Sequence, residues 1–242
     1  SRRGEAVPRY AAHLEANGLR GKRIGVLRSY AGAGDDARIG DILDRSIERL
    51  RGLGAVIVDP IEIDTDGMGD AEYEVLLYEF KADLNDYLAS SHAPVPSLAG
   101  IIDFNRAHAA EVMPFFGQDI MELSQAKGPL TEPAYREALG KSKKIAQRAI
   151  DATFEQHDLD ALIAPSNGPA WLTDHVLGDH FSVGSSSFAA ISGYASITVP
   201  AGYIAGLPIG ISFIGSAFSE EELIELAYAF EQASRIRRPP SD

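Results

Sequence analysis

The segment from Asp158 to Gly215 constrains the fold more than any other part of this chain. It contains three short apolar runs, Ala161–Ala164, Ser196–Val199 and Pro208–Ile214, and each run is bounded by glycine or proline. Short apolar runs between turn residues are typical of buried strands. We predict a strand, a long loop, a helix of small residues and then two strands, with turn residues at Pro200–Gly202 and at Gly206–Pro208.

The N-terminal part of the chain predicts a strand, a helix and a second strand. The strands are expected at Lys22–Arg28 and Ala55–Asp59, and Asp35 or Asp36 is expected to cap the helix between them. Apolar residues at helical spacing define the inward face of that helix: Ile39, Ile42, Leu43, Ile47 and Leu50. Two strands joined by a helix through short connections are expected to pair in parallel, with a right-handed crossover.

The middle of the chain is predominantly helical. A long helix is predicted at Asp70–Ala89, short ones at Ser97–His108 and Gln118–Gln125, and the longest at Thr131–His157. The first of these is expected to turn five residues inward: Val75, Leu76, Phe80, Leu84 and Leu88.

A last helix is expected to begin with a capping box formed by Ser219 and Glu222. Helices and strands interleave along the chain, so the predicted class is α/β. The helices between residues 70 and 157 are expected to form a lobe over one end of the sheet.

The composition of the chain disfavours some classes of partner and excludes cysteine chemistry. The net charge of −13 disfavours nucleic acid and anionic membrane surfaces as partners, because both require a surplus of lysine and arginine. The chain has no cysteine, which removes disulfides, thiolate metal ligands and thiol nucleophiles. No apolar run approaches the roughly 20 residues that span a bilayer. The compartment stays open, with the cytoplasm favoured.

Several motifs, in order and in register, resemble the C-terminal part of the amidase signature family. The matching stretches are LDALIAPSNGPA (Leu159–Ala170), SGYASITVPAG (Ser192–Gly202), GLPIGISFIG (Gly206–Gly215) and EEELIELAYAFEQAS (Glu220–Ser234). Two further stretches narrow the resemblance to the peptide-amidase-like branch: IIDFNRAHAAEVMPFFGQDI (Ile101–Ile120) and PAWLTD (Pro169–Asp174).

The resemblance implies that residues 1–242 are the C-terminal part of an amidase signature domain, a mixed β-sheet flanked by helices. The family hydrolyses a carboxamide to a carboxylate and ammonia without a cofactor. It uses a serine nucleophile, a second serine on a cis peptide bond, a lysine, and a glycine-serine loop that supplies oxyanion-hole amides. These parts lie N-terminal to the matched region, and the sequence has no G-G-S-S-G-G loop. We therefore assign no catalytic residue and expect the chain to be inactive without the missing N-terminal half.

Three other groups contain the residue types of a catalytic or metal site, but we expect other roles for them. Gly184–Phe188 has the composition of a nucleophile loop, but we predict a helix start that is capped by serine. Ser142 beside Lys141, Lys143 and Lys144 is expected to lie on a helix whose lysines are solvated. The group Asp174, His175, Asp179 and His180 lacks a familiar ligand spacing, so no metal is expected.

The function left to this part of the fold is the wall of a pocket for a small amide or a peptide amide. Asn167 and Trp171 follow a predicted strand, and ligands of α/β folds bind at the carboxyl ends of strands. By resemblance, Asp179 is a candidate to bind a substrate amino group, and Phe116 and Gln118 are further candidates.

Two alternative functions remain open from the sequence. The chain can also be a fragment similar to the A subunit of an aminoacyl-tRNA amidotransferase, a member of the same family. An alternative of another class is a non-catalytic α/β module that folds alone and binds a small ligand.

Overall fold

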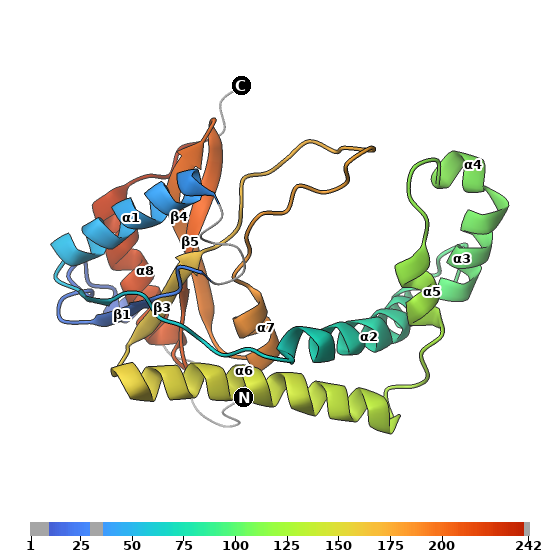
Figure 1. Ribbon diagram of the computed structural model, residues 1–242, viewed down its shortest axis with the longest axis horizontal. Helices are drawn as coiled ribbons and strands as arrows, with labels where there is room; N and C mark the ends of the chain where they lie inside the picture. The colour runs from blue at the N-terminus through green and yellow to red at the C-terminus, as the bar shows by residue number, and fades with distance from the viewer. Residues whose placement is uncertain (1–9, 30–35, 240–242) are drawn as a thin grey trace. The chain divides into compact units, whose positions relative to one another are not determined.

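The computed structural model describes residues 10–29 and 36–239, which divide into two units (Figure 1). Among the described residues, the first unit comprises 10–29, 36–64, 146–171 and 180–239 and contains the β-sheet. The second comprises residues 65–145 and 172–179 and is helical. The boundary at residue 145 falls within a single long helix, α6 (Pro133–His157).

The first unit is built on a five-stranded mixed sheet in the order β2-β1-β3-β5-β4. Its strands are β1 (Arg23–Val26), β2 (Val56–Val58), β3 (Ala161–Pro165), β4 (Ser196–Ile204) and β5 (Leu207–Ile214). Strand β1 pairs in parallel with β2 and β3, whereas β5 is antiparallel to both β3 and β4. The predicted α/β class and the parallel pairing of the first two strands are confirmed.

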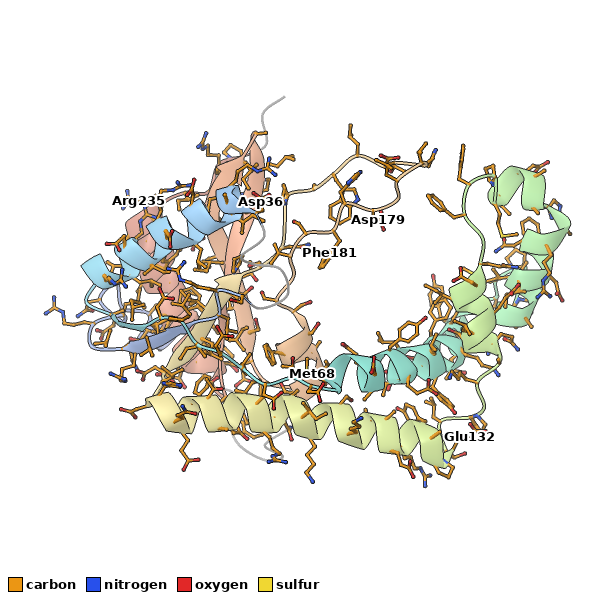
Figure 2. The ribbon with its side chains drawn as sticks, viewed as in Figure 1. Asp36, Met68, Glu132, Asp179, Phe181 and Arg235 are labelled. Carbon is orange, nitrogen blue, oxygen red and sulfur yellow. The ribbon has the colours of Figure 1, made fainter. Side chains whose placement is uncertain are left out.

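Helix α1 (Ala37–Gly52) follows from its sequence pattern as predicted. The Oδ1 atom of Asp36 accepts a hydrogen bond from the amide of Arg38 at 2.9 Å, so Asp36 is the N-cap (Figure 2). The other candidate cap, Asp35, lies outside the described residues. All five predicted inward residues of α1 are buried against the sheet, which confirms that face of the helix.

The hydrophobic core of the first unit lies between the sheet and the pair α1 and α8 (Glu220–Ser234) (Figure 1). The rings of Phe213 on β5 and Phe230 on α8 meet edge to face, with centroids 6.1 Å apart. Aromatic pairs favour this geometry because the positive ring edge faces the negative ring face. Helix α8 is therefore held on the sheet by apolar packing.

The predicted turn at Pro200–Gly202 is wrong. These residues stay within β4, and the pairing register with β5 shifts between Pro200 and Gly202, which is an irregularity of the β-bulge kind. A Cβ atom on Gly202 would lie 3.0 Å from Cγ1 of Ile42, so glycine permits the close approach of α1. The chain reverses instead at Ala205 and Gly206, where φ is +49° and +84°, and the predicted strand pair with a tight turn is confirmed.

The predicted capping box of α8 is also wrong. Ser219 is the N-cap residue, but its hydroxyl donates to the carbonyl of Ser216 at 2.9 Å. Glu222 instead accepts from the ammonium group of Lys22 at 2.5 Å, and Lys22 also donates to Asp160 at 3.1 Å. Burial opposes the charge on Lys22, but its two carboxylate partners outweigh burial and raise its pKa. Lys22 precedes β1 and Asp160 precedes β3, so these ion pairs link the starts of both strands to Glu222 on α8.

The second unit packs four helices and the N-terminal part of α6. The four helices are α2 (Met68–Ser90), α3 (Leu98–Ala107), α4 (Ala109–Val112) and α5 (Asp119–Gln125). Figure 2 shows Met68 where α2 begins and Glu132 just before α6. The helices predicted in this region are confirmed, although the helix expected at Ser97–His108 ends earlier and is followed by α4.

The predicted inward face of α2 is wrong in part. Val75 is buried as expected, but Leu76 is 53% exposed and Phe80 is 40% exposed. The helix buries Tyr78 instead, which packs with Val75 and Tyr135. Because α2 carries apolar residues on more than one side, hydrophobic spacing alone does not select the buried one.

Two tyrosine–carboxylate hydrogen bonds fix that buried face. The hydroxyl of Tyr78 donates to Glu132 and the hydroxyl of Tyr135 donates to Glu79, each at 2.7 Å. The two tyrosine rings lie 5.6 Å apart between their centroids. Each hydrogen bond favours the neutral phenol and raises the pKa of its tyrosine to about 12.

No helix in the described part of the chain combines the length and the apolar character needed to cross a bilayer.

We expect Asp36→Ala to lower the free energy of unfolding of the protein by about 1 kcal/mol, because the Arg38 amide in the first turn of α1 loses its side-chain acceptor. Asp36→Asn keeps a capping oxygen and should cost much less at neutral pH. The Arg38 side chain lowers the pKa of Asp36, so the contribution of the carboxylate is present above the ordinary aspartate pKa and is lost as pH falls through the lowered value. Urea unfolding at neutral and acidic pH measures both effects, and equal losses for the two variants would contradict the capping role.

We expect the helical unit to weaken in alkali through Tyr78 and Tyr135. Their folded pKa of about 12 exceeds the ordinary value of 10.0, so their contribution is complete below pH 10 and is lost as pH rises toward 12. In the Tyr78→Phe/Tyr135→Phe double variant, the free energy of unfolding should fall less steeply across this range than in the parent protein. Tyr73→Phe on the exposed side of α2 serves as the control, and identical slopes for all three proteins would contradict the assignment.

Candidate functional site

The loop that follows β3 is held by backbone hydrogen bonds on both sides. The amide of Ser166 donates to the carbonyl of Gly210 on β5 at 2.9 Å. Further along, an isolated antiparallel bridge pairs Asn167 with Gly184. The amide of Ser185 donates back to the carbonyl of Ser166 at 3.2 Å. These contacts fix the residues at the carboxyl end of β3.

Three hydroxyl groups form a closed ring at this end of the sheet, and we call them the hydroxyl ring: Ser166, Thr198 and Ser212. Ser166 donates to Thr198 at 3.3 Å, Ser212 donates to Ser166 at 2.8 Å, and Thr198 and Ser212 lie 2.9 Å apart. Each hydroxyl has one proton, and a closed ring uses all three protons internally. The remaining lone pairs make the ring a hydrogen-bond acceptor, suited to the N–H group of an amide.

Gly210 makes room for the hydroxyl ring. A Cβ atom there would lie 2.7 Å from Cγ2 of Thr198 and 2.8 Å from Oγ of Ser166. Sequence reasoning missed the ring altogether. A signal was present, because Thr198 and Ser212 are direct partners in the β4–β5 register and therefore share one face of the sheet.

The serine-rich segment before α7 (Ser187–Ser192) is a helix start, as predicted, but serine does not cap it. Ser186 occupies the N-cap position with helical backbone angles, φ −74° and ψ −25°, and its side chain makes no capping hydrogen bond. A capping residue normally has extended angles that bring its oxygen over the first amides. The neighbouring Ser185 is 2% exposed, and within the described residues its hydroxyl has no hydrogen-bond partner.

Asn167 and Trp171 lie on the loop at the carboxyl end of β3, as the sequence predicted. Asn167 is exposed and directly follows Ser166 of the hydroxyl ring, while its Oδ1 atom accepts from the amide of Gly168 at 3.0 Å. The side-chain NH2 of Asn167 is a hydrogen-bond donor, which complements the acceptors of the ring. Trp171 is 37% exposed in the same loop.

The other three candidates belong to the second unit. Gln118 precedes α5, where its amide accepts from Asn105 at 3.0 Å and donates to the carbonyl of Ile102 at 3.1 Å. Both ends of that amide therefore help to hold α5 on α3. Phe116 and Asp179 are exposed. Contact of any of the three with substrate stays a prediction.

Asp174 and His175, from the group with the residue types of a metal site, make other contacts. Oδ1 of Asp174 accepts the amides of Val176 and Leu177, each at 2.8 Å, and so shapes its own loop. The ring of His175 stacks on Phe115, with centroids 4.2 Å apart. Across the described residues, no three histidine or carboxylate side chains are grouped as metal ligands would be.

Among the described residues, the hydroxyl ring and Ser142 offer hydrogen-bonding groups rather than an activated nucleophile. In the structure as described, the hydroxyls of the ring bond to one another and none bonds to a lysine or histidine. A serine becomes a nucleophile only when an adjacent base takes its proton. Ser142 is buried and donates to Leu139 in its own helix, while Lys141 beside it is exposed as predicted. Neither group forms an activated hydroxyl.

Comparison with known proteins points to one family. The family model described as Amidase matches residues 3–224. The native peptide amidase from Stenotrophomonas maltophilia superposes with a TM-score of 0.85 at 43% identity, covering 98% of this chain and 48% of that one. A structure of the peptide amidase PAM with the competitive inhibitor chymostatin gives a TM-score of 0.88 at 44% identity, over 99% and 49% of the two chains.

Two curated relatives agree with these structures. A probable amidase from Arabidopsis thaliana is 36% identical over 96% of this chain and 42% of its own length. The A subunit of the glutamyl-tRNA(Gln) amidotransferase from Moorella thermoacetica is 29% identical over 96% and 48%. The chain spans about half the length of the curated relatives it matches.

The chain belongs to the amidase signature family. Within that family it falls in the peptide-amidase-like branch, and its mixed sheet with flanking helices is the amidase signature fold.

We expect Ser166→Ala to lower the free energy of unfolding by about 1 kcal/mol, because the buried Ser212 hydroxyl loses its acceptor. Replacing all three members, by Ser166→Ala, Thr198→Val and Ser212→Ala together, should cost less than the sum of the single changes, since no hydroxyl is then left without a partner. Ser196→Ala, on the same strand as Thr198 but outside the ring, is the control. Urea unfolding measures each variant, and strictly additive losses would contradict a closed ring.

Proposed function

We propose that this chain is the C-terminal part of an enzyme that hydrolyses a carboxamide to a carboxylate and ammonia. Water supplies the oxygen of the new carboxylate, and the C–N bond of the amide breaks. The observation that carries the proposal is the hydroxyl ring beside Asn167, at the carboxyl end of β3, in a chain of the amidase family. That edge of an α/β sheet is where ligands bind.

The substrate class that we favour is a peptide amide or a simple linear amide. Identities of 43% and 44% to peptide amidases support this choice. The acceptors of the hydroxyl ring suit the N–H groups of such a substrate, and the NH2 group of Asn167 suits a carbonyl. Trp171 offers an aromatic surface on the same loop. Phe116, Gln118 and Asp179 remain candidates on the family resemblance alone.

In this proposal the chain provides the pocket wall and another segment provides the catalytic groups. The sequence contains no G-G-S-S-G-G loop. The whole relatives are about twice as long as the matched region, which leaves room for a nucleophile, a bridging serine and a lysine elsewhere. The proposed partner is therefore the N-terminal half of the same enzyme, and no cofactor is needed.

A second candidate is the function of the amidotransferase A subunit. Its support is the 29% identity to the Moorella thermoacetica protein, which is well below the identity to the peptide amidases. A dependence of the whole enzyme on ATP and charged tRNA would decide for this candidate.

We expect the purified chain to release no ammonia from a C-terminal peptide amide above the buffer rate. Adding the separately produced N-terminal half should restore release, since that half carries the activated serine. A coupled ammonia assay measures both. Release by the chain alone would contradict the proposal.

The same reconstituted enzyme tests the pocket wall. Asn167→Ala should lower kcat/KM by about tenfold, the loss expected for one hydrogen bond of about 1.4 kcal/mol in the transition state. Asn17→Ala, an exposed asparagine in a surface turn, is the matched control and should leave kcat/KM unchanged. Equal activity of the two variants would remove Asn167 from the site.

A further inference from the structure

Four arginines from separate parts of the first unit converge on one pocket of about 370 Å³. We call it the arginine pocket, and its arginines are Arg45, Arg49, Arg235 and Arg238. Two come from α1 and two from the segment at the end of α8, and the remaining wall is formed by the end of β4 around Tyr203. Figure 2 shows Arg235 beside α1. Such a gathering of positive charge is unexpected in a chain of net charge −13.

No ion pair with a described carboxylate neutralises the positive charge in the pocket. Arg45 and Arg49 are four residues apart on α1, where like charges repel. Asp44, next to Arg45, pairs with Arg28 at 2.8 Å. Glu48, next to Arg49, pairs with Arg51 at 2.6 Å. Within residues 10–29 and 36–239, none of the four arginines of the pocket forms an ion pair with a carboxylate. An anion from solution would relieve this repulsion.

The segment after α8 holds its arginines in place. The guanidinium group of Arg238 lies 4.5 Å above the ring of Tyr203, and the backbone amide of Arg238 donates to the Tyr203 hydroxyl at 2.9 Å. That hydroxyl donates in turn to the carbonyl of Ile236 at 3.3 Å. The segment is thereby tied to β4, so Arg238 is positioned before any ligand arrives.

Arg235 occupies a backbone conformation that is unusual for arginine. It is the C-cap of α8 and has φ +46°, the left-handed conformation that favours glycine. A cation at a helix C-terminus is favourable because of the helix dipole. That effect accounts for Arg235 but not for the two arginines of α1 or for Arg238.

We propose that the arginine pocket binds an oxyanion of the phosphate class, either inorganic phosphate or the phosphate group of a monoester. The guanidinium fork matches two phosphate oxygens at once, which a lysine cannot do. The volume suits a small ligand. None of the lining residues belongs to the hydroxyl ring or to the loop at residues 166–171, so this is a second site, independent of amide binding.

Binding is tested on the 242-residue chain by calorimetric titration and thermal unfolding at constant ionic strength. The probes are inorganic phosphate and phenyl phosphate, with chloride as the reference anion. We expect saturable binding of a phosphate probe and a Tm that rises with the logarithm of its concentration. Tighter binding of phosphate identifies the free ion as the ligand, and tighter binding of phenyl phosphate identifies a monoester.

Variants separate a built site from general charge attraction. Arg45→Ala with Arg238→Ala should weaken binding by at least about tenfold, since two charge-assisted contacts are lost. Arg49→Lys, which keeps the charge but loses the fork, should weaken it less. Arg148→Ala, an exposed arginine on α6 that does not line the pocket, is the control and should bind as the parent does. Absence of saturable binding, or an equal loss in the control, would overturn the proposal, and neither result depends on amidase activity.

Discussion

The central strand β3 is the constraint on which the first unit depends. All five of its residues are buried, and both of its edges are paired, in parallel with β1 and antiparallel with β5. Because β3 is buried and paired on both edges, only the residues just before and just after it are open to other contacts. Asp160, at its entrance, is bound by Lys22 and by the amide of Arg23. Burial alone would raise the pKa of Asp160, but these two donors more than offset it and lower the pKa. At the exit stand Ser166 and Asn167.

The change from parallel to antiparallel pairing creates the candidate site. Because β5 runs antiparallel to both of its neighbours, Ser212 is aligned with Ala164 on one side and with Thr198 on the other. Two residues beyond Ala164, the hydroxyl of Ser166 completes the ring with those two side chains. The result is a set of acceptors fixed by the sheet, with no base to activate them. The chain spans about half the length of its relatives, and the proposed function accordingly assigns substrate binding to these residues and bond cleavage to another segment.

Much of the fold could be predicted from the sequence because strong local patterns agree with the tertiary structure. The inward face of α1 and the buried run of β3 are examples, and the loop carrying Asn167 followed from them. The failures at α8 and α2 share a cause. Glu222 binds Lys22, and Tyr78 fixes the face of α2 through Glu132, so partners distant in sequence override the local signal. The hydroxyl ring depends on the register of β4 against β5, which hydrophobic patterning does not specify.

The most direct test of the account is a crystal structure of the whole enzyme with a slowly hydrolysed peptide amide bound. We expect the ligand to lie at the carboxyl end of β3, with an amide group in hydrogen-bond contact with Asn167 or the hydroxyl ring. The attacking hydroxyl should come from outside the 242 residues. A ligand whose carbonyl carbon faces a serine of this chain, with a lysine or histidine beside that serine, would contradict it.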